Sequence, residues 1–138
     1  MKKILYIFLV LTIMTSCYDE EYFIDDNTTT NGDHYPVIQS LVVEGEMVSG
    51  NSLNLIMHYW SLDAIDHFEL YSTEPEQDEA LVASIPYQYS YDEETESEVI
   101  TISYEIPTVS SGAEIDLRVL VINENGLERE TTTSITIE

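Results

Sequence analysis

The sequence contains three histidines, His34, His58 and His67, and histidine is the commonest protein ligand for metal ions. His58 and His67 would face each other if the segments around them formed a hairpin through residues 61–64. In the two-sheet architecture argued below, these segments belong to different sheets. Two imidazoles without a cysteine or a third histidine also make a poor zinc site. We therefore expect no metal site and no cofactor, and we expect His34 to lie in solvent.

Residues capable of nucleophilic or acid–base catalysis are present but are not arranged in a recognisable way. A nucleophilic serine or cysteine needs a histidine base and a third group that orients the base, and no segment combines these types in such a context. Carboxylates are abundant and could serve glycoside hydrolysis by residue type alone. That reaction needs a cleft, which a single small β-sandwich rarely provides. We therefore expect that the protein is not an enzyme.

Three tyrosines, Tyr87, Tyr89 and Tyr91, occupy alternate positions directly before an acidic run at residues 92–98. Alternate residues of a strand share a face, and exposed rings can stack on sugars or pack against a partner protein. With Trp60 they form a candidate ligand or partner surface. Alternatively, the tyrosines form an inward or cross-strand face of an ordinary strand, and the acids a solvated hairpin end. One flat exposed aromatic face would favour glycan binding, whereas buried tyrosines would favour a structural or protein-interaction module.

The only cysteine, Cys17, follows a short apolar segment near the N-terminus. Lys2 and Lys3 precede residues 4–14, in which Thr12 alone is polar, and small residues then lead to Cys17. A basic start, a short apolar run and a small-residue ending are typical of an export signal peptide. The run is shorter than the roughly 20 apolar residues that a membrane-spanning helix needs. We therefore expect residues 1–16 to be removed after export.

Residues 14–17, Met-Thr-Ser-Cys, resemble the lipobox of bacterial lipoproteins. This resemblance implies that Cys17 is diacylated, becomes the first residue and attaches the protein to a membrane. Behind it, Asp19, Glu20 and Glu21 resemble the acidic signal of Bacteroidetes lipoproteins that reach the outer face of the outer membrane. The resemblance implies a surface-exposed outer-membrane location. The alternative is a solvated acidic linker.

Charge limits the classes of partner. Four Lys and Arg stand against 27 Asp and Glu, and loss of Lys2 and Lys3 takes the formal charge from −23 to −25. Arg118 and Arg129 are then the only basic side chains. Nucleic-acid binding is therefore excluded, because it depends on Lys and Arg that neutralise phosphates. Proteins or glycans at the cell surface remain as expected partners.

The chain divides into a polar segment and a strand-rich domain. Residues 17–35 show no helical or strand periodicity, and we interpret them as a lipidated, flexible, acidic tether. Residues 36–138 consist of short runs rich in β-branched and aromatic residues, separated by Gly, Pro or Asn. The expected strands cover residues 37–44, 52–60, 65–72, 80–91 with a break at Pro86, 99–106, 114–123 and 127–137.

Alternation indicates which side chains are buried. Ile115, Leu117, Val119 and Val121 share one face of their strand, and so do Ile100, Ile102, Tyr104 and Ile106. The opposite, outward face of this strand carries Leu120 and Ile122. Asn125 and Gly126 predict a two-residue type I′ hairpin between the last two strands.

About seven short strands with regular turns predict an all-β, two-sheet antiparallel β-sandwich. Residues 65–70 resemble the third strand of fibronectin type III and related immunoglobulin-like domains, and residues 117–123 with Gly126 resemble the strand and turn near the end of such domains. Two positions depart from that pattern. Ile115 stands in place of the usual tyrosine, and Met57 in place of the usual tryptophan, with Trp60 displaced. The resemblance implies the fold and no activity.

Overall fold

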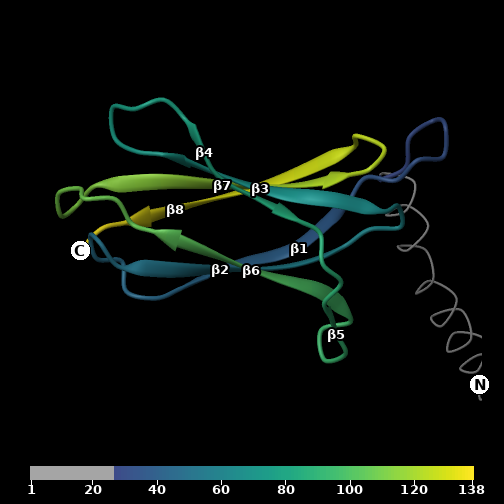
Figure 1. Ribbon diagram of the computed structural model, residues 1–138, viewed down its shortest axis with the longest axis horizontal. Coiled ribbons are helices and arrows are strands. Elements are labelled where there is room, and N and C mark those ends of the chain that lie inside the picture. The colour runs from purple at the N-terminus through teal and green to yellow at the C-terminus, as the bar shows by residue number, and fades with distance from the viewer. Residues whose placement is uncertain (1–26) are drawn as a thin grey trace, which may run out of the picture. The chain divides into compact units, whose positions relative to one another are not determined.

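The computed structural model describes residues 27–138, and every regular element in this part of the chain is a β-strand (Figure 1). Cys17, Asp19, Glu20 and Glu21 lie outside the described residues. Within residues 27–138, no helix is long and apolar enough to cross a membrane. The strands are β1 (Val37–Glu44), β2 (Ser52–Trp60), β3 (Ile65–Thr73), β4 (Ala80–Pro86), β5 (Tyr91–Asp92), β6 (Ser97–Glu105), β7 (Glu114–Asn123) and β8 (Glu128–Thr136).

The strands form two four-stranded sheets, with the orders β1-β2-β6-β5 and β4-β3-β7-β8, and all neighbouring strands are antiparallel. Figure 1 shows the sheets as two layers viewed along their edges. The predicted two-sheet antiparallel sandwich is thus confirmed. If β4 is taken as an added C′ strand, the two sheets correspond to the ABED and C′CFG sheets of immunoglobulin-type sandwiches.

The strand predicted for residues 80–91 is wrong in one respect, because it forms two strands in different sheets. β4 ends at Pro86, and the Tyr87 N–H still donates to the Asp66 carbonyl at 3.0 Å. The chain then crosses to the other layer and pairs with β6 as the short β5 (Figure 1). Proline has no N–H to continue a ladder, which explains why the pairing with β3 stops here. The domain therefore has eight strands instead of about seven.

The core lies between the two sheets and follows the predicted alternation. Ile115, Leu117, Val119 and Val121 of β7 are fully buried in it. From the facing sheet, Ile102, Tyr104 and Ile106 are buried and Ile100 packs against them. The rings of Tyr59 and Phe68 meet edge to face, with centroids 5.0 Å apart, and so join β2 to β3 across the core. Met57 and Ile115, which depart from the fibronectin pattern, are both core residues.

The outward face of β7 is less exposed than predicted. Ile122 is half-buried, but Leu120 is only 6% exposed, although it does not belong to the core cluster. Leu120 lies in register between Glu69 of β3 and Glu130 of β8. Long charged side chains cover neighbouring apolar surface with their methylene groups while the charge stays in water. The orientation of Leu120 was therefore predicted correctly, and its expected exposure was wrong.

The hairpin between β7 and β8 exists, but its turn is not type I′. Gly126 has a φ of 81°, whereas Asn125 is not among the residues with positive φ, as a type I′ turn would require. The Gly126 N–H donates to the Asn123 carbonyl and the Asn123 N–H donates to the Leu127 carbonyl, both at 2.9 Å. This is a three-residue loop that ends in a left-handed glycine. The Asn125 side-chain oxygen accepts from the Leu127 N–H at 3.0 Å, which favours this geometry.

The chain divides into two compact units, with the boundary between Asp33 and His34. In the first unit, the described residues include a turn in which the Thr29 N–H donates to the Asp33 carbonyl at 2.8 Å. In the second, His34 is half-buried, and its N–H donates to the Asp63 carboxylate at 2.6 Å. The expectation that His34 lies in solvent is therefore wrong. Its carbonyl is also held, at 2.9 Å, by the side-chain amide of the buried Asn123.

Candidate interaction surface

The crossover from β4 to β5 carries the three tyrosines of the predicted surface, and they have different environments. Tyr87 packs against the core, whereas Tyr89 is 74% exposed and Tyr91 is 49% exposed. Only Tyr91 lies in a strand of the β6 sheet, and Tyr87 and Tyr89 lie in no strand. The three rings therefore do not line one face of one strand.

A carboxylate holds the buried end of this crossover. The hydroxyl of Tyr87 donates to Glu98 Oε2 at 2.8 Å, and the hydroxyl of Tyr59 approaches the same oxygen at 3.4 Å. Burial, together with the hydrogen bond and the charge of Glu98, raises the pKa of Tyr87 to about 12. Burial and Glu98 also raise the pKa of Tyr59. Both hydroxyls therefore stay protonated as donors, and Glu98 fixes the start of the crossover against β6.

Trp60 and Tyr91 project from opposite faces of the β1-β2-β6-β5 sheet. Tyr91 is in register with Glu98, and Glu98 with Tyr59, so these three side chains share a face. Tyr59 is fully buried in the core, which makes this the inner face. Trp60 follows Tyr59 in β2 and therefore points to the outer face. The predicted four-residue aromatic surface is thus not a single surface.

An open pocket of about 300 Å³ lies beside Tyr89, where the end of β4 approaches the edge of β6. Its partly buried apolar side chains are Ile85 from β4 and Val99 and Ile100 from β6. Ser90 anchors the rim, because its hydroxyl donates to the Val99 carbonyl and its own carbonyl accepts from the Val99 N–H at 2.9 Å. The pocket is at the small end of the range for ligand sites and is suited to one or two apolar side chains.

The electrostatic character of this region is uniformly negative. Every charged residue between Asp92 and Glu105 is acidic, and the strands of this sheet contain no lysine or arginine. Both arginines of the described chain lie in the other sheet. The Arg118 guanidinium forms two hydrogen bonds with Glu79, at 2.7 and 2.5 Å, and Arg129 lies over the Tyr35 ring at 5.1 Å. Neither arginine offsets the negative field around the tyrosines.

The histidines are separated, as predicted for His58 and His67, which lie in different sheets. His58 Nδ1 is 3.2 Å from the Ser97 hydroxyl. His67 Nδ1 is 2.8 Å from Asp66 Oδ2, and this hydrogen bond raises the pKa of His67. Among residues 27–138, no three His, Cys, Asp or Glu side chains are grouped so that they could hold a metal ion.

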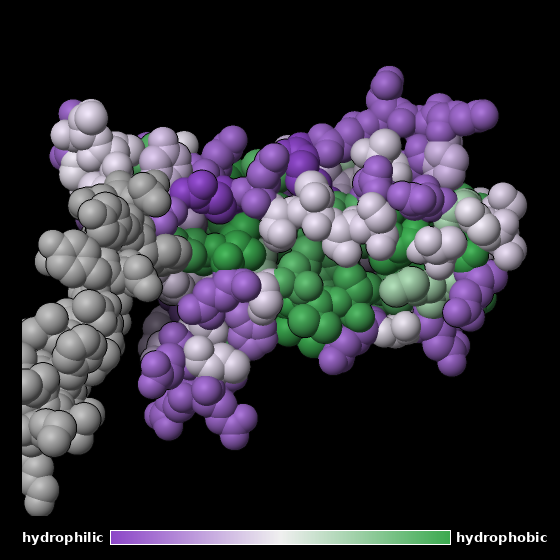
Figure 2. Space-filling view, turned by 180° about the vertical axis from the view of Figure 1, so that it is seen from behind, coloured by the Kyte–Doolittle hydropathy of each residue, from purple (hydrophilic) through white to green (hydrophobic). Residues whose placement is uncertain are grey.

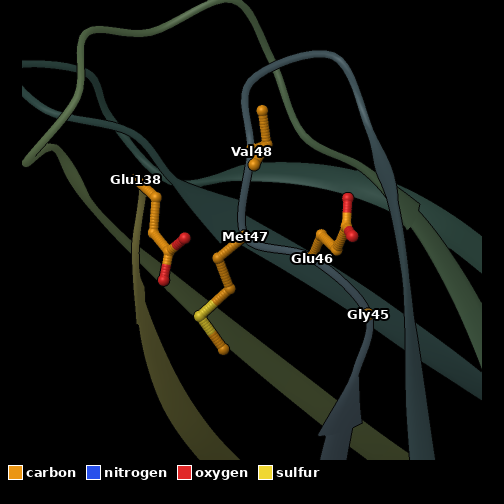
Figure 3. Close-up of a pocket in the computed structure, with 5 residues that line it drawn as sticks. All are labelled: Gly45, Glu46, Met47, Val48 and Glu138. Carbon is orange, nitrogen blue, oxygen red and sulfur yellow. The ribbon is translucent and has the colours of Figure 1, made fainter.

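A second open pocket, of about 560 Å³, lies between the loop that joins β1 to β2 and the C-terminal residue of the chain. It is lined by Gly45, Glu46, Met47, Val48 and Glu138, and in Figure 3 the Met47 side chain lies between the two carboxylates. The Glu138 N–H donates to the Met47 carbonyl at 2.8 Å. No cationic side chain lines this pocket, and it has one partly buried apolar side chain, so it offers less for recognition than the pocket beside Tyr89.

Sequence reasoning did not identify Glu98, Ile85 or Val99 as parts of this region. Glu98 was one acid among several in the run at residues 92–98, and only its register with Tyr59 distinguishes it. The break at Pro86 was the available signal for a crossover. It could not show which sheet the chain joins next, and the pocket exists only because β4 and β6 belong to different sheets.

No protein-family model matches the chain, and a comparison with curated proteins gives no match. Among solved structures, two crystal forms of wild-type OgpA from Akkermansia muciniphila are similar, at 13% and 12% identity with TM-scores of 0.56 and 0.57. Each alignment covers 80% of this chain, and they cover 29% and 31% of OgpA. Spo0M, a sporulation control protein from Bacillus subtilis, is 12% identical with a TM-score of 0.51, over 75% of this chain and 49% of Spo0M.

The chain therefore spans about a third of OgpA and half of Spo0M. At this identity the likeness is one of fold alone.

Proposed function

We propose that the protein is an outer-membrane lipoprotein, facing the cell exterior, whose single immunoglobulin-like β-sandwich serves as a non-catalytic protein-interaction module. The anchoring part of the proposal rests on sequence: the signal-like residues 1–16, Cys17 at the lipobox and the acids Asp19 to Glu21. An N-terminal lipid would then attach the domain to the membrane.

The proposed role in protein interaction rests on one observation, the exposed Tyr89 side chain beside an apolar pocket. Tyrosine is enriched in protein interfaces because its ring contributes apolar area and its hydroxyl a hydrogen bond. Glycan binding through a flat aromatic platform is less well supported. Tyr87 packs against the core, and Trp60 and Tyr91 point to opposite faces of their sheet.

Anchoring is tested by Cys17→Ala. We expect this variant to lose lipidation and to leave the membrane fraction or remain unprocessed, because acyl chains are the attachment that the lipobox resemblance implies. Membrane fractionation identical to that of the unaltered protein would contradict the lipoprotein assignment.

Interaction is tested by cross-linking on intact cells. We expect a Tyr89→Ser, Tyr91→Ser double variant to lose cross-linked proteins that the unaltered protein retains. The matched control is Leu81→Ser with Val82→Ser, since these side chains are also exposed but lie on β4 away from the crossover tyrosines. An identical set of cross-linked proteins in both variants would contradict the assignment of the tyrosines to an interface.

A further inference from the structure

The outer edge of β6 is open over most of its length. β6 has nine residues, but β5 has two and pairs only with Ser97 and Glu98. Ser90 extends this contact to Val99. Residues 100–105 have β2 on one side and, in the part of the chain that the structure describes, no strand on the other. In Figure 1, β5 accordingly lies at one end of β6.

The backbone groups on this edge can be assigned by alternation. In an antiparallel ladder, every second residue directs its N–H and C=O to the same neighbour. Ile106 faces β2, because its N–H donates to the Asn51 carbonyl at 2.8 Å, whereas Val99 faces away from β2. Thr101, Ser103 and Glu105 share the parity of Val99 and are exposed. They therefore direct their N–H and C=O groups to the open edge.

β6 differs from other edges of the sandwich in its regularity. The pairing of β1 with β2 is interrupted between Ile38 and Ser40, and that of β4 with β3 between Leu70 and Tyr71. Such a shift interrupts the ladder, and β-bulges are known to twist an edge away from further pairing. β8 is regular but lies against β1. The pairing of β2 with β6 has no such irregularity, so β6 offers a regular edge to a further strand.

On the back of the molecule, hydrophobic side chains gather between bands of polar residues (Figure 2). At β6, an open strand edge, an apolar pocket and exposed tyrosines occur together, with the pocket shared by Val99, Ile100 and Thr101 at the start of the open segment.

We propose that the open edge of β6 accepts an extended segment of a partner protein as an added strand, and that this segment is basic. The inference rests on the proposed interaction function and specifies its partner. Main-chain hydrogen bonds to Thr101, Ser103 and Glu105 give affinity, and alternate side chains give specificity. One set of side chains enters the apolar pocket beside Tyr89, and the other lies on the outer face.

The charge of the surrounding surface indicates that the side chains of the added segment on the outer face are lysine or arginine. An added residue opposite Glu105 has a carboxylate within cross-strand distance, and opposite charges in such pairs are stabilising. The acidic run at residues 92–98 adjoins the same edge. The tyrosine rings also attract cations through their π-systems. Since Arg118 and Arg129 are engaged in the other sheet, an acidic segment would meet no compensating charge here.

The test uses the full-length protein in neutral detergent and a short, blocked peptide of alternating lysine and valine, about seven residues long to match the edge. We expect amide hydrogen exchange at Thr101, Ser103 and Glu105 to slow by about tenfold or more on peptide binding, because new hydrogen bonds protect these groups. A peptide of the same charge with alternate backbone nitrogens methylated on its pairing side should bind weakly and give no such protection.

Protein variants separate strand pairing from simple charge attraction. Ser103→Pro removes an edge N–H that β2 does not use, and it should abolish the protection while the fold is kept. The matched control is Thr132→Pro. The Asn123 N–H donates to the Leu127 carbonyl, so Leu127 and every second residue after it direct their backbone groups to β7. The N–H of Thr132 is therefore directed away from β7. This control should bind the peptide normally.

Two results would overturn the inference. Equal exchange protection by the methylated peptide would show that pairing with the edge is not required, and this comparison decides even if Ser103→Pro fails to fold. Equal binding of a peptide with glutamate in place of lysine would show that the partner need not be basic. If strand addition at β6 is disproved but cross-linking still depends on Tyr89 and Tyr91, the proposed interaction function stands. Failure of the strand-addition proposal can thus be distinguished from failure of the proposed function.

Discussion

Glu98 and Tyr87 are joined by a hydrogen bond of 2.8 Å between a β6 carboxylate and the hydroxyl of a residue that has just left β4. The bond links the two sheets at the point where the chain crosses between them. Hydrogen bonds to charged groups contribute more than those between neutral groups. The pair is also accessible to mutation without removal of a core residue.

The first prediction is that Tyr87→Phe lowers the free energy of unfolding by about 1 kcal/mol, because it removes a charge-assisted hydrogen bond that is only partly shielded from water. Tyr89→Phe is the matched control, since Tyr89 is largely exposed and should change stability little. Urea denaturation of the three proteins provides the measurement. Equal losses in both variants would argue against a stabilising role for the Glu98 contact.

The second prediction concerns alkaline pH. The pKa of Tyr87 is about 12 in the folded protein against 10.0 for an ordinary tyrosine, so the folded state holds this proton more tightly. The associated stability is fully present below about pH 10 and is lost as pH rises towards about 12, because the unfolded chain ionises first. Denaturation midpoints between these limits should fall more steeply for the unaltered protein than for Tyr87→Phe. Parallel pH profiles would refute this assignment.

The alternation in β7 shows what could be predicted from the sequence. Val119 and Val121 were placed in the core because a period of two admits only two choices of face, and the charged neighbours Asp116 and Arg118 decide between them. Local pattern and tertiary structure agree here. The same holds for the hairpin position, since Gly126 marks a turn whatever its type.

The crossover could not be predicted in the same way. Pro86 signals an interruption, but residues 80–91 carry no information on which sheet receives the chain afterwards. The split between β4 and β5 depends on contacts between different strands, such as that of Tyr87 with Glu98 of β6. The open edge of β6 follows from the shortness of β5, which is a result of this split. The proposed site therefore lies where the sequence pattern is least informative.

The third prediction compares two glycines. Gly126 has a φ of 81° and open space around its Cα, so Gly126→Ala introduces backbone strain alone, of about 1–2 kcal/mol. Gly45 has a φ of 130°, and a Cβ there would lie 2.8 Å from Leu53 Cδ2, a buried core atom. Gly45→Ala should therefore reduce the denaturation midpoint further. The reverse order would show that the β1–β2 loop can shift to accommodate the methyl group.

The fourth prediction addresses Asp19, Glu20 and Glu21, which lie outside the described residues. If these acids direct export to the cell surface, their joint replacement by alanine should reduce cleavage of the domain by protease added to whole cells. Total protein and membrane fractionation should be unchanged, because Cys17 is retained. A matched variant with three acids replaced at Glu93, Glu94 and Glu96 controls for the change in net charge. Equal accessibility in all three strains would assign the first acids to a plain linker.

The last prediction tests the facing of β7 by single alanine substitutions. Val119→Ala and Val121→Ala should each lower the free energy of unfolding by about 1–3 kcal/mol, since each removes buried methyl groups and leaves a cavity between the sheets. Ile122→Ala should have a smaller effect although it removes a larger side chain, because Ile122 is half-buried on the outer face. Leu120→Ala should fall between them, because Leu120 is almost fully buried but lies outside the core cluster, in register with Glu69 and Glu130 on the outer face. Denaturant midpoints for the four variants decide the order. If Ile122→Ala proves the most destabilising, the facing of β7 is inverted, and the burial of its core side chains would have to be reassigned.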